Sequence, residues 1–184
     1  MPPAAAHLAD RALVISDING STRMSARRGD LAVHNLVRSF HGRAAALALQ
    51  HNGRLLKEIG DSFLAVFNEA ADALRFARAL PSVFYPDDAV SNEELSLKAA
   101  IHFGEVSVGE TPYGEDVFGQ NVNLVARLEG VAGPKEIVIS EAAMQRLSAE
   151  ELGLVNRLET SELKGIGKVG FGRLGFGRMQ LAGA

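Results

Sequence analysis

The feature that most constrains the fold is a pair of short apolar segments that meet at a Gly-Asp dipeptide. Residues 54–59 and 62–67 flank Gly60-Asp61, and apolar runs of this length around a turn dipeptide predict a β-hairpin. A helical spacing of apolar residues precedes the hairpin over 30–50, and another follows it over 69–80. A hairpin between amphipathic helices needs a sheet that those helices cover, which favours an α+β architecture.

The rest of the chain continues this pattern of short strands and helices. Further strands are predicted at 12–15, 95–103, 105–108 and 137–139, and further helices at 119–131 and 140–147. Polar loops are predicted at 81–94 and 110–116, a loop or the start of a helix at 17–29, and strands in the remainder. The order is approximately β-α-β-β-α-β-β-α-β. It predicts an α+β, ferredoxin-like sandwich with a mainly antiparallel central sheet and flanking helices.

Length and composition indicate one globular domain. At 184 residues the chain fits a single domain. Residues 1–9 are small and Pro-rich and are interpreted as a flexible N-terminal leader, followed by one domain over 10–184. The absence of cysteine excludes disulfides, thiol catalysis, zinc–thiolate sites and iron–sulfur clusters. A net charge of −3 argues against a general nucleic-acid binder, which would be strongly basic.

No segment of the sequence is long and apolar enough to cross a membrane. The longest unbroken apolar run is 44–49, whereas a bilayer requires about 20 residues. The first residues lack the basic start and apolar stretch of a signal peptide. The expected location is cytoplasmic.

Two aspartates are placed where their carboxylates can converge. Asp17 follows a predicted buried strand, and Asp61 lies at the predicted hairpin tip. Paired carboxylates without His or Cys suit hard cations such as Mg²⁺ or Mn²⁺, and two-metal sites of this kind serve phosphoryl transfer. By position alone, each aspartate fits an ordinary cap or turn residue better than a metal ligand.

Three segments in order, with a fourth behind them, carry a family resemblance. They are Asp17-Ile-Asn-Gly-Ser-Thr22, Lys57-Glu-Ile-Gly-Asp61, Asp116-Val-Phe-Gly-Gln-Asn-Val-Asn-Leu-Val-Ala-Arg127 and Leu163-Lys-Gly165. Together they resemble the catalytic domain of class III nucleotidyl cyclases, the adenylyl and guanylyl cyclases, over roughly residues 11–167. The resemblance implies a class III cyclase fold for the single domain.

The resemblance also implies ligands for metal and base. Asp17 and Asp61 match the two metal-binding aspartates of the family, and the Ile18 carbonyl supplies a further oxygen, so two divalent cations, Mg²⁺ or Mn²⁺, are implied. Lys57 and Asp116 match the pair that selects adenine: a Lys donor serves N1, and a carboxylate accepts from the exocyclic amine. Guanine presents the reverse pattern, and guanylyl cyclases of the family have Glu in place of Lys57. ATP is therefore favoured over GTP.

Three further residues match family positions that contact the sugar and phosphates. Asn123 and Arg127 match residues that orient the ribose and stabilise the transition state, and their spacing places them on one helix face. Arg suits phosphate because its planar fork donates two hydrogen bonds. Lys164 matches a triphosphate-contacting Lys. Taken singly, Arg127 is equally consistent with pairing to Glu129 or solvent, and Lys164 with a solvated turn.

The implied activity is conversion of ATP to 3′,5′-cyclic AMP and pyrophosphate, by two-metal-assisted attack of the ribose 3′-hydroxyl on the α-phosphate. The family works as a head-to-tail dimer, so a homodimer with shared sites is expected, with regulatory domains, if any, outside this chain. One alternative is a catalytically silent nucleotide-binding or regulatory module of cyclase-like fold. Another is a diguanylate-type cyclase or polymerase palm, whose Gly-Gly-acidic-acidic-Phe signature this sequence lacks.

The histidines carry weaker signals. His34 and His41 lie two helical turns apart, and this spacing is interpreted as helix surface rather than as a metal pair. His102, in mid-strand, is interpreted as a core or sheet-face residue. The Gly-rich segment after Lys168 leaves the register of the final strand open.

Overall fold

The computed structural model of the protein describes residues 5–84 and 95–177. Its strands are β1 His7–Asn19, β2 Gly53–Ile59, β3 Ser62–Phe67, β4 Ser96–Thr111, β5 Gly114–Phe118, β6 Glu136–Ser140, β7 Arg157–Leu163 and β8 Gly167–Gly175. Its helices are α1 Ser21–Arg28, α2 Asp30–Gln50, α3 Ala70–Ala79, the 3₁₀ turn η1 Leu80–Val83, α4 Gln120–Glu129, α5 Glu141–Met144 and α6 Ala149–Leu152. No helix of the described ranges combines the length and apolarity needed to span a membrane.

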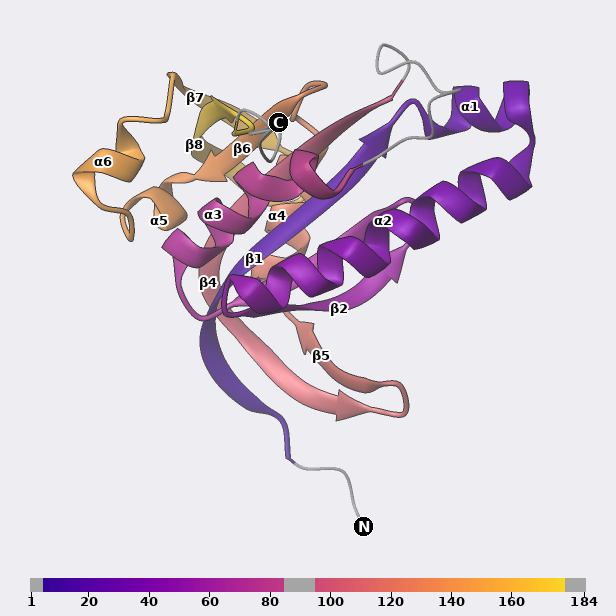
Figure 1. Cartoon of the computed structure of the whole chain (residues 1–184). Coiled ribbons are helices and arrows are strands. Elements are labelled where there is room, and N and C mark those ends of the chain that lie inside the picture. The colour runs from indigo at the N-terminus through magenta and orange to yellow at the C-terminus, as the bar shows by residue number, and fades with distance from the viewer. Residues whose placement is uncertain (1–4, 85–94, 178–184) are drawn as a thin grey trace.

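One mixed sheet organises these elements (Figure 1). The strand order is β2-β3-β1-β4-β6-β8-β7, with β5 paired to β4. Among the described strands, β4 and β6 run parallel and the other neighbours run antiparallel. The predicted α+β class with a mainly antiparallel sheet is confirmed.

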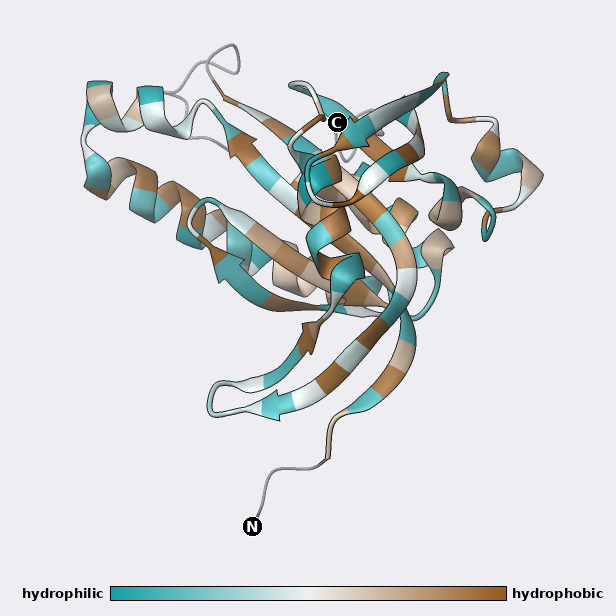
Figure 2. Ribbon diagram, turned by 180° about the vertical axis from the view of Figure 1, so that it is seen from behind, coloured by the Kyte–Doolittle hydropathy of each residue, from teal (hydrophilic) through white to brown (hydrophobic). Residues whose placement is uncertain are grey.

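Each face of the sheet has its own apolar layer. On one face α2 and α3 pack against it, with Phe40 and Phe76 on either side of Phe63 at ring-centroid distances of 5.8 and 6.1 Å. On the opposite face, in front in Figure 2, α4 buries Val125 and Leu128 in the other layer. Because side chains alternate along a strand, neighbouring residues of β1 serve the two layers in turn.

The predicted helix over 30–50 is α2. Its buried stripe includes His41 but not Leu31, which is 73% exposed. The prediction that His41 lies on the helix surface is therefore wrong, while His34 is exposed as predicted. The His41 ring packs edge-on against Phe63, at a centroid distance of 5.6 Å, so it lies on the stripe that meets the sheet.

Two strands extend beyond their predicted ends. The first begins at His7, which pairs with Val108, so 7–9 belong to the sheet rather than to the expected leader; residues 1–4 lie outside the described ranges. The predicted break at Gly104 is absent, because β4 runs through it, and a Cβ there would lie 2.6 Å from the Asn121 side chain. The predicted loop at 110–116 is the end of β4, a turn and most of β5.

Helical segments also differ in extent. The segment 17–29, expected as a loop or the start of a helix, holds the end of β1 and the helix α1, and the helix expected over 140–147 shortens to α5. Of the loop expected at 81–94, the part 85–94 lies outside the described residues, as does 178–184. The register of the final strand, which the sequence left open, is set by pairing of β8 with β6 and β7.

Candidate functional site

The turn of the β2–β3 hairpin places Asp61 close to the segment that holds Asp17. Gly60 occupies the left-handed region, with φ of 64°, which glycine adopts at no steric cost. Because β3 pairs with β1, the turn lies beside the end of β1 that holds Asp17. The Ser62 hydroxyl donates to Oδ1 of Asp17 at 2.8 Å, and the Ser21 hydroxyl donates to Oδ2 of Asp61. Each aspartate is therefore bonded to a serine from the other's segment.

These residues form an oxygen-rich set of the kind that hard cations prefer. Asp17, Asp61 and the Ile18 carbonyl are its candidate ligands, and His and Cys take no part in it. Within the described ranges no group of three or more His, Cys, Asp or Glu side chains gathers for a metal. A cation at this edge would therefore depend on the two carboxylates and the carbonyl. That donor set fits Mg²⁺ or Mn²⁺.

A lysine that the sequence reasoning missed lies beside Asp17. Lys98 is its cross-strand partner on β4, and its Nζ is 3.4 Å from Oδ2 of Asp17 and 2.7 Å from Oε1 of Glu129. Burial acts to lower the pKa of Lys98, but the neighbouring Glu129 and then Asp17 outweigh it, so the pKa is raised. A lysine within a mostly apolar predicted strand was the available signal.

The two residues proposed to read the base lie together. Nζ of Lys57 on β2 donates to Oδ2 of Asp116 on β5 at 2.8 Å. Oδ1 of Asp116 accepts from the backbone N–H of Val117 at 2.8 Å, which orients the carboxylate. The Lys57 ammonium also lies 5.5 Å from the centroid of the Phe118 ring. Both charged side chains remain partly open to solvent.

The remaining candidates stand apart from these pairs. Asn123 and Arg127 are exposed on α4, whose Val125 and Leu128 face the sheet. Lys164 is exposed in the turn between β7 and β8. In the part of the chain that the structure describes, none of the three exposed residues makes a side-chain hydrogen bond or ion pair. The alternative pairing of Arg127 with Glu129 is not formed there.

The start of α4 is fixed by a buried histidine. Nε2 of His102 lies 2.8 Å from Oδ1 of Asn121, and its Nδ1 lies 2.8 Å from Oγ of Ser140. Nδ2 of Asn121 donates to the Glu105 carbonyl at 2.7 Å. Burial lowers the pKa of His102, and the hydrogen bond with Asn121 opposes this. His102 is a core residue as predicted, whereas its partner Asn121 was missed.

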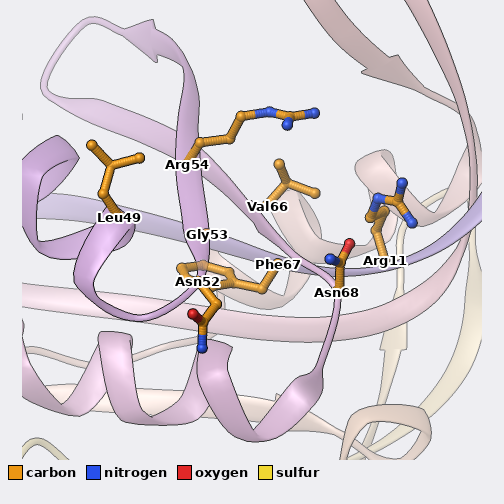
Figure 3. Close-up of a pocket in the computed structure, with 8 residues that line it drawn as sticks. All are labelled: Arg11, Leu49, Asn52, Gly53, Arg54, Val66, Phe67 and Asn68. Carbon is orange, nitrogen blue, oxygen red and sulfur yellow. The ribbon is translucent and has the colours of Figure 1, made fainter.

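A separate small pocket lies at the open end of the same hairpin (Figure 3). Its volume is about 190 Å³, and Arg11 and Arg54 lie on its rim. Arg54 is already paired with Glu115. None of the predicted site residues lines this pocket, so it is not part of the candidate site.

Comparisons with known proteins identify the family of this chain. A family model described as "Adenylate and Guanylate cyclase catalytic domain" matches residues 5–174. An adenylate cyclase of Streptomyces coelicolor is 34% identical over 147 residues, 79% of this chain and 35% of that protein. An adenylate cyclase of Streptomyces griseus is 33% identical over 131 residues, 71% of this chain and 31% of that protein. The chain thus spans about a third of the length of these relatives.

The fold is also that of solved cyclase domains. The catalytic core of a rhodopsin-guanylyl cyclase with converted specificity, in complex with ATPαS, matches with a TM-score of 0.80 at 22% identity. The match covers 92% of this chain and 98% of that one. At this identity the likeness shows the shared fold and leaves the choice of nucleotide to the site itself.

Proposed function

Since this chain belongs to the adenylate and guanylate cyclase catalytic domain family, we propose that it converts ATP to 3′,5′-cyclic AMP and pyrophosphate. The observation that carries the choice of ATP is the contact between Lys57 and Asp116. Their ammonium and carboxylate supply one donor and one acceptor side by side, which matches N1 and the exocyclic amine of adenine. Guanine presents a protonated N1 and a carbonyl, so this pair would leave its polar groups mispaired.

Residues from His7 onward would form the single catalytic domain. Asp17, Asp61 and the Ile18 carbonyl would hold two divalent cations, which when bound would favour ionisation of the ribose 3′-hydroxyl and offset charge on the phosphates. Asn123 would orient the ribose. The Arg127 guanidinium would donate to the α-phosphate as negative charge develops there.

The partners of this reaction are ATP and a second copy of the chain. Arg127, Asn123 and Lys164 are exposed and without partners in the described part of one chain. In a head-to-tail homodimer, Asp17 and Asp61 of one protomer would face the base-reading pair and α4 of the other, and Lys164 would contact the triphosphate. Two equivalent sites would form, and a monomer would have none. We place this activity in the cytoplasm, where ATP is available.

Product analysis tests the proposal directly. Purified chain is incubated with ATP or with GTP, each with Mg²⁺ or Mn²⁺, and the products are separated and identified by mass. Cyclic AMP formed in excess over cyclic GMP is the expected result. A preference for GTP would overturn the base assignment, and no cyclic product from a folded dimer would favour the silent cyclase-like module.

A further inference from the structure

Lys98 has two carboxylate partners that belong to different parts of the molecule. Asp17 lies across the β1–β4 pairing, and Glu129 is the last residue of α4. The three side chains are largely shielded, with exposed fractions of 21% for Lys98, 18% for Asp17 and 15% for Glu129. Charges in such surroundings interact more strongly than charges in open water. The position of the Lys98 ammonium group therefore affects the electrostatic energy of both carboxylates.

Both carboxylate oxygens of Asp17 are already in use. Oδ1 accepts from Ser62 at 2.8 Å, and Oδ2 faces the Lys98 ammonium at 3.4 Å. A divalent cation that approaches Oδ2 meets a positive charge at close range, and like charges repel. The shorter contact of Lys98, 2.7 Å, is with Glu129. The ammonium can therefore leave Asp17 and keep a partner.

We propose that Lys98 competes with the metal for Asp17 and that Glu129 draws it away, so that these two residues set the metal affinity of the site. The inference rests on the proposed function, because it takes Asp17 as a metal ligand. Lys98 and Glu129 act here through Asp17. They are residues that tune the affinity of this ligand, distinct from the residues proposed to contact the reacting atoms.

The opposite role for Lys98 makes the opposite prediction. If the ammonium served to hold the Asp17 carboxylate in the orientation that a metal requires, its removal would weaken metal binding. If it competes, its removal strengthens binding. The sign of the change in affinity therefore distinguishes the two roles, without any measurement of catalysis.

The experiment measures Mn²⁺ binding to the full chain by loss of the free-ion electron paramagnetic resonance signal, at fixed ionic strength. Lys98→Met, which keeps length and removes charge, is expected to bind Mn²⁺ about threefold to tenfold more tightly than wild type. Glu129→Gln leaves Lys98 with Asp17 alone and is expected to weaken binding by a similar factor. The double variant is expected to bind as tightly as Lys98→Met, to within about twofold.

The double variant separates competition from simple charge. Glu129 is itself negative, so its loss weakens the attraction for any nearby cation. If Glu129→Gln weakens binding equally with and without Lys98, its effect is only that of its own charge, and the proposal is overturned. Unchanged or weaker binding by a folded Lys98→Met also overturns it.

Two controls set this inference apart from the proposed function. Lys168→Met removes a lysine that is exposed on β8, two strands beyond β4 in the sheet, and is expected to leave the Mn²⁺ affinity unchanged. If Lys168→Met raised the affinity as much as Lys98→Met, the effect of Lys98 would be only that of the net charge of the chain. Asp17→Ala is expected to abolish the tightest binding. If Asp17→Ala still binds Mn²⁺ as tightly as wild type, the assignment of Asp17 as a metal ligand is wrong. If Asp17→Ala loses affinity but Lys98→Met gains none, only the proposed competition by Lys98 is wrong.

Discussion

The carboxylate edge and the outer face of α4 contrast in how far one chain completes them. At the edge, Asp17 and Asp61 each have a serine partner, and Asp17 also has Lys98. On α4, Asn123 and Arg127 are exposed and make no such contact within the described ranges. The two aspartates are held in place by contacts within the chain, whereas Asn123 and Arg127 are exposed to other molecules.

The difference follows from the cost of burial. A partly buried carboxylate without partners would pay a large desolvation penalty, so folding must supply donors to Asp17 and Asp61. An exposed guanidinium is solvated by water and needs no protein partner. The contrast indicates that contacts within one chain organise the carboxylate edge, whereas the proposed function would supply partners for the α4 face from substrate and a second chain.

Removal of either aspartate is expected to have the largest effect. Asp17→Ala or Asp61→Ala should lower cyclic AMP formation by about a thousandfold or more, because metal assistance is worth several kcal/mol. Rates with Mn²⁺ and ATP, together with circular dichroism to establish folding, provide the measurement. Asp10→Ala removes an exposed carboxylate from the same strand and should retain activity. Substantial activity in either folded site variant would contradict the two-metal assignment.

Mixing two inactive variants tests whether the two regions serve one site from different chains. Asp17→Ala retains the α4 residues, and Arg127→Ala retains both aspartates. Random pairing of equal amounts makes about half of the dimers mixed, each with one intact site, so activity should recover to about a quarter of wild type.

Cyclic AMP production across mixing ratios, at fixed total protein, provides the measurement. Subunit exchange is monitored separately with labelled chains. Mixtures that exchange subunits and stay inactive would show that each site is built within one chain, and the contrast between the two regions would then have another cause.

Substitution of Lys57 and Asp116, the pair proposed to read the base, is expected to have an intermediate effect on activity with ATP. Lys57→Glu with Asp116→Cys reverses the donor and acceptor that face the base. A mispaired buried polar group costs about 1–3 kcal/mol, so kcat/KM for ATP should fall between about tenfold and more than a hundredfold, while GTP use falls less or rises. Competition between the two nucleotides measures the ratio. An unchanged preference for ATP would show that the pair does not read the base.

Changes to His102, whose contacts hold the start of α4, are expected to have the smallest effect, and that effect is on the stability of the fold. Because burial lowers the pKa of His102 below its ordinary value of 6.5, the folded chain binds its proton less readily than the unfolded chain. Stability should therefore be maintained above pH 6.5 and decline as the pH falls below it towards the folded-state pKa. Denaturant unfolding across this range provides the measurement.

His102→Gln is the matched variant for these contacts. It should lose about 1–2 kcal/mol at pH 8, because the contacts with Asn121 and Ser140 are disturbed, and should lose less further stability on acidification. His34→Gln, at an exposed position of α2, should follow wild type. If the acid decline is equally steep in His102→Gln, titration of another group is responsible.

Local sequence patterns predicted the elements that position the site. The Gly60-Asp61 hairpin, the long helix α2 and the helix that carries Asn123 and Arg127 all follow from runs and spacings of apolar residues, because these periodicities reflect the face that each element buries. The convergence of Asp17 with Asp61 also followed, since a strand end and a neighbouring hairpin tip meet at one edge. The resemblance supplied the roles proposed for these residues, which no spacing could provide.

Contacts between segments far apart in the sequence could be identified only from the tertiary structure. Pairing of Asp17 with Lys98 depends on the β1–β4 register, and a shift of one residue would turn Lys98 to the other face. The burial of His41 depends on which side of α2 meets Phe63, and pairing of β5 with β4 turned an expected loop into the strand that carries Asp116. Periodicity specifies that a residue is buried or exposed, whereas register and packing decide which distant residue it contacts.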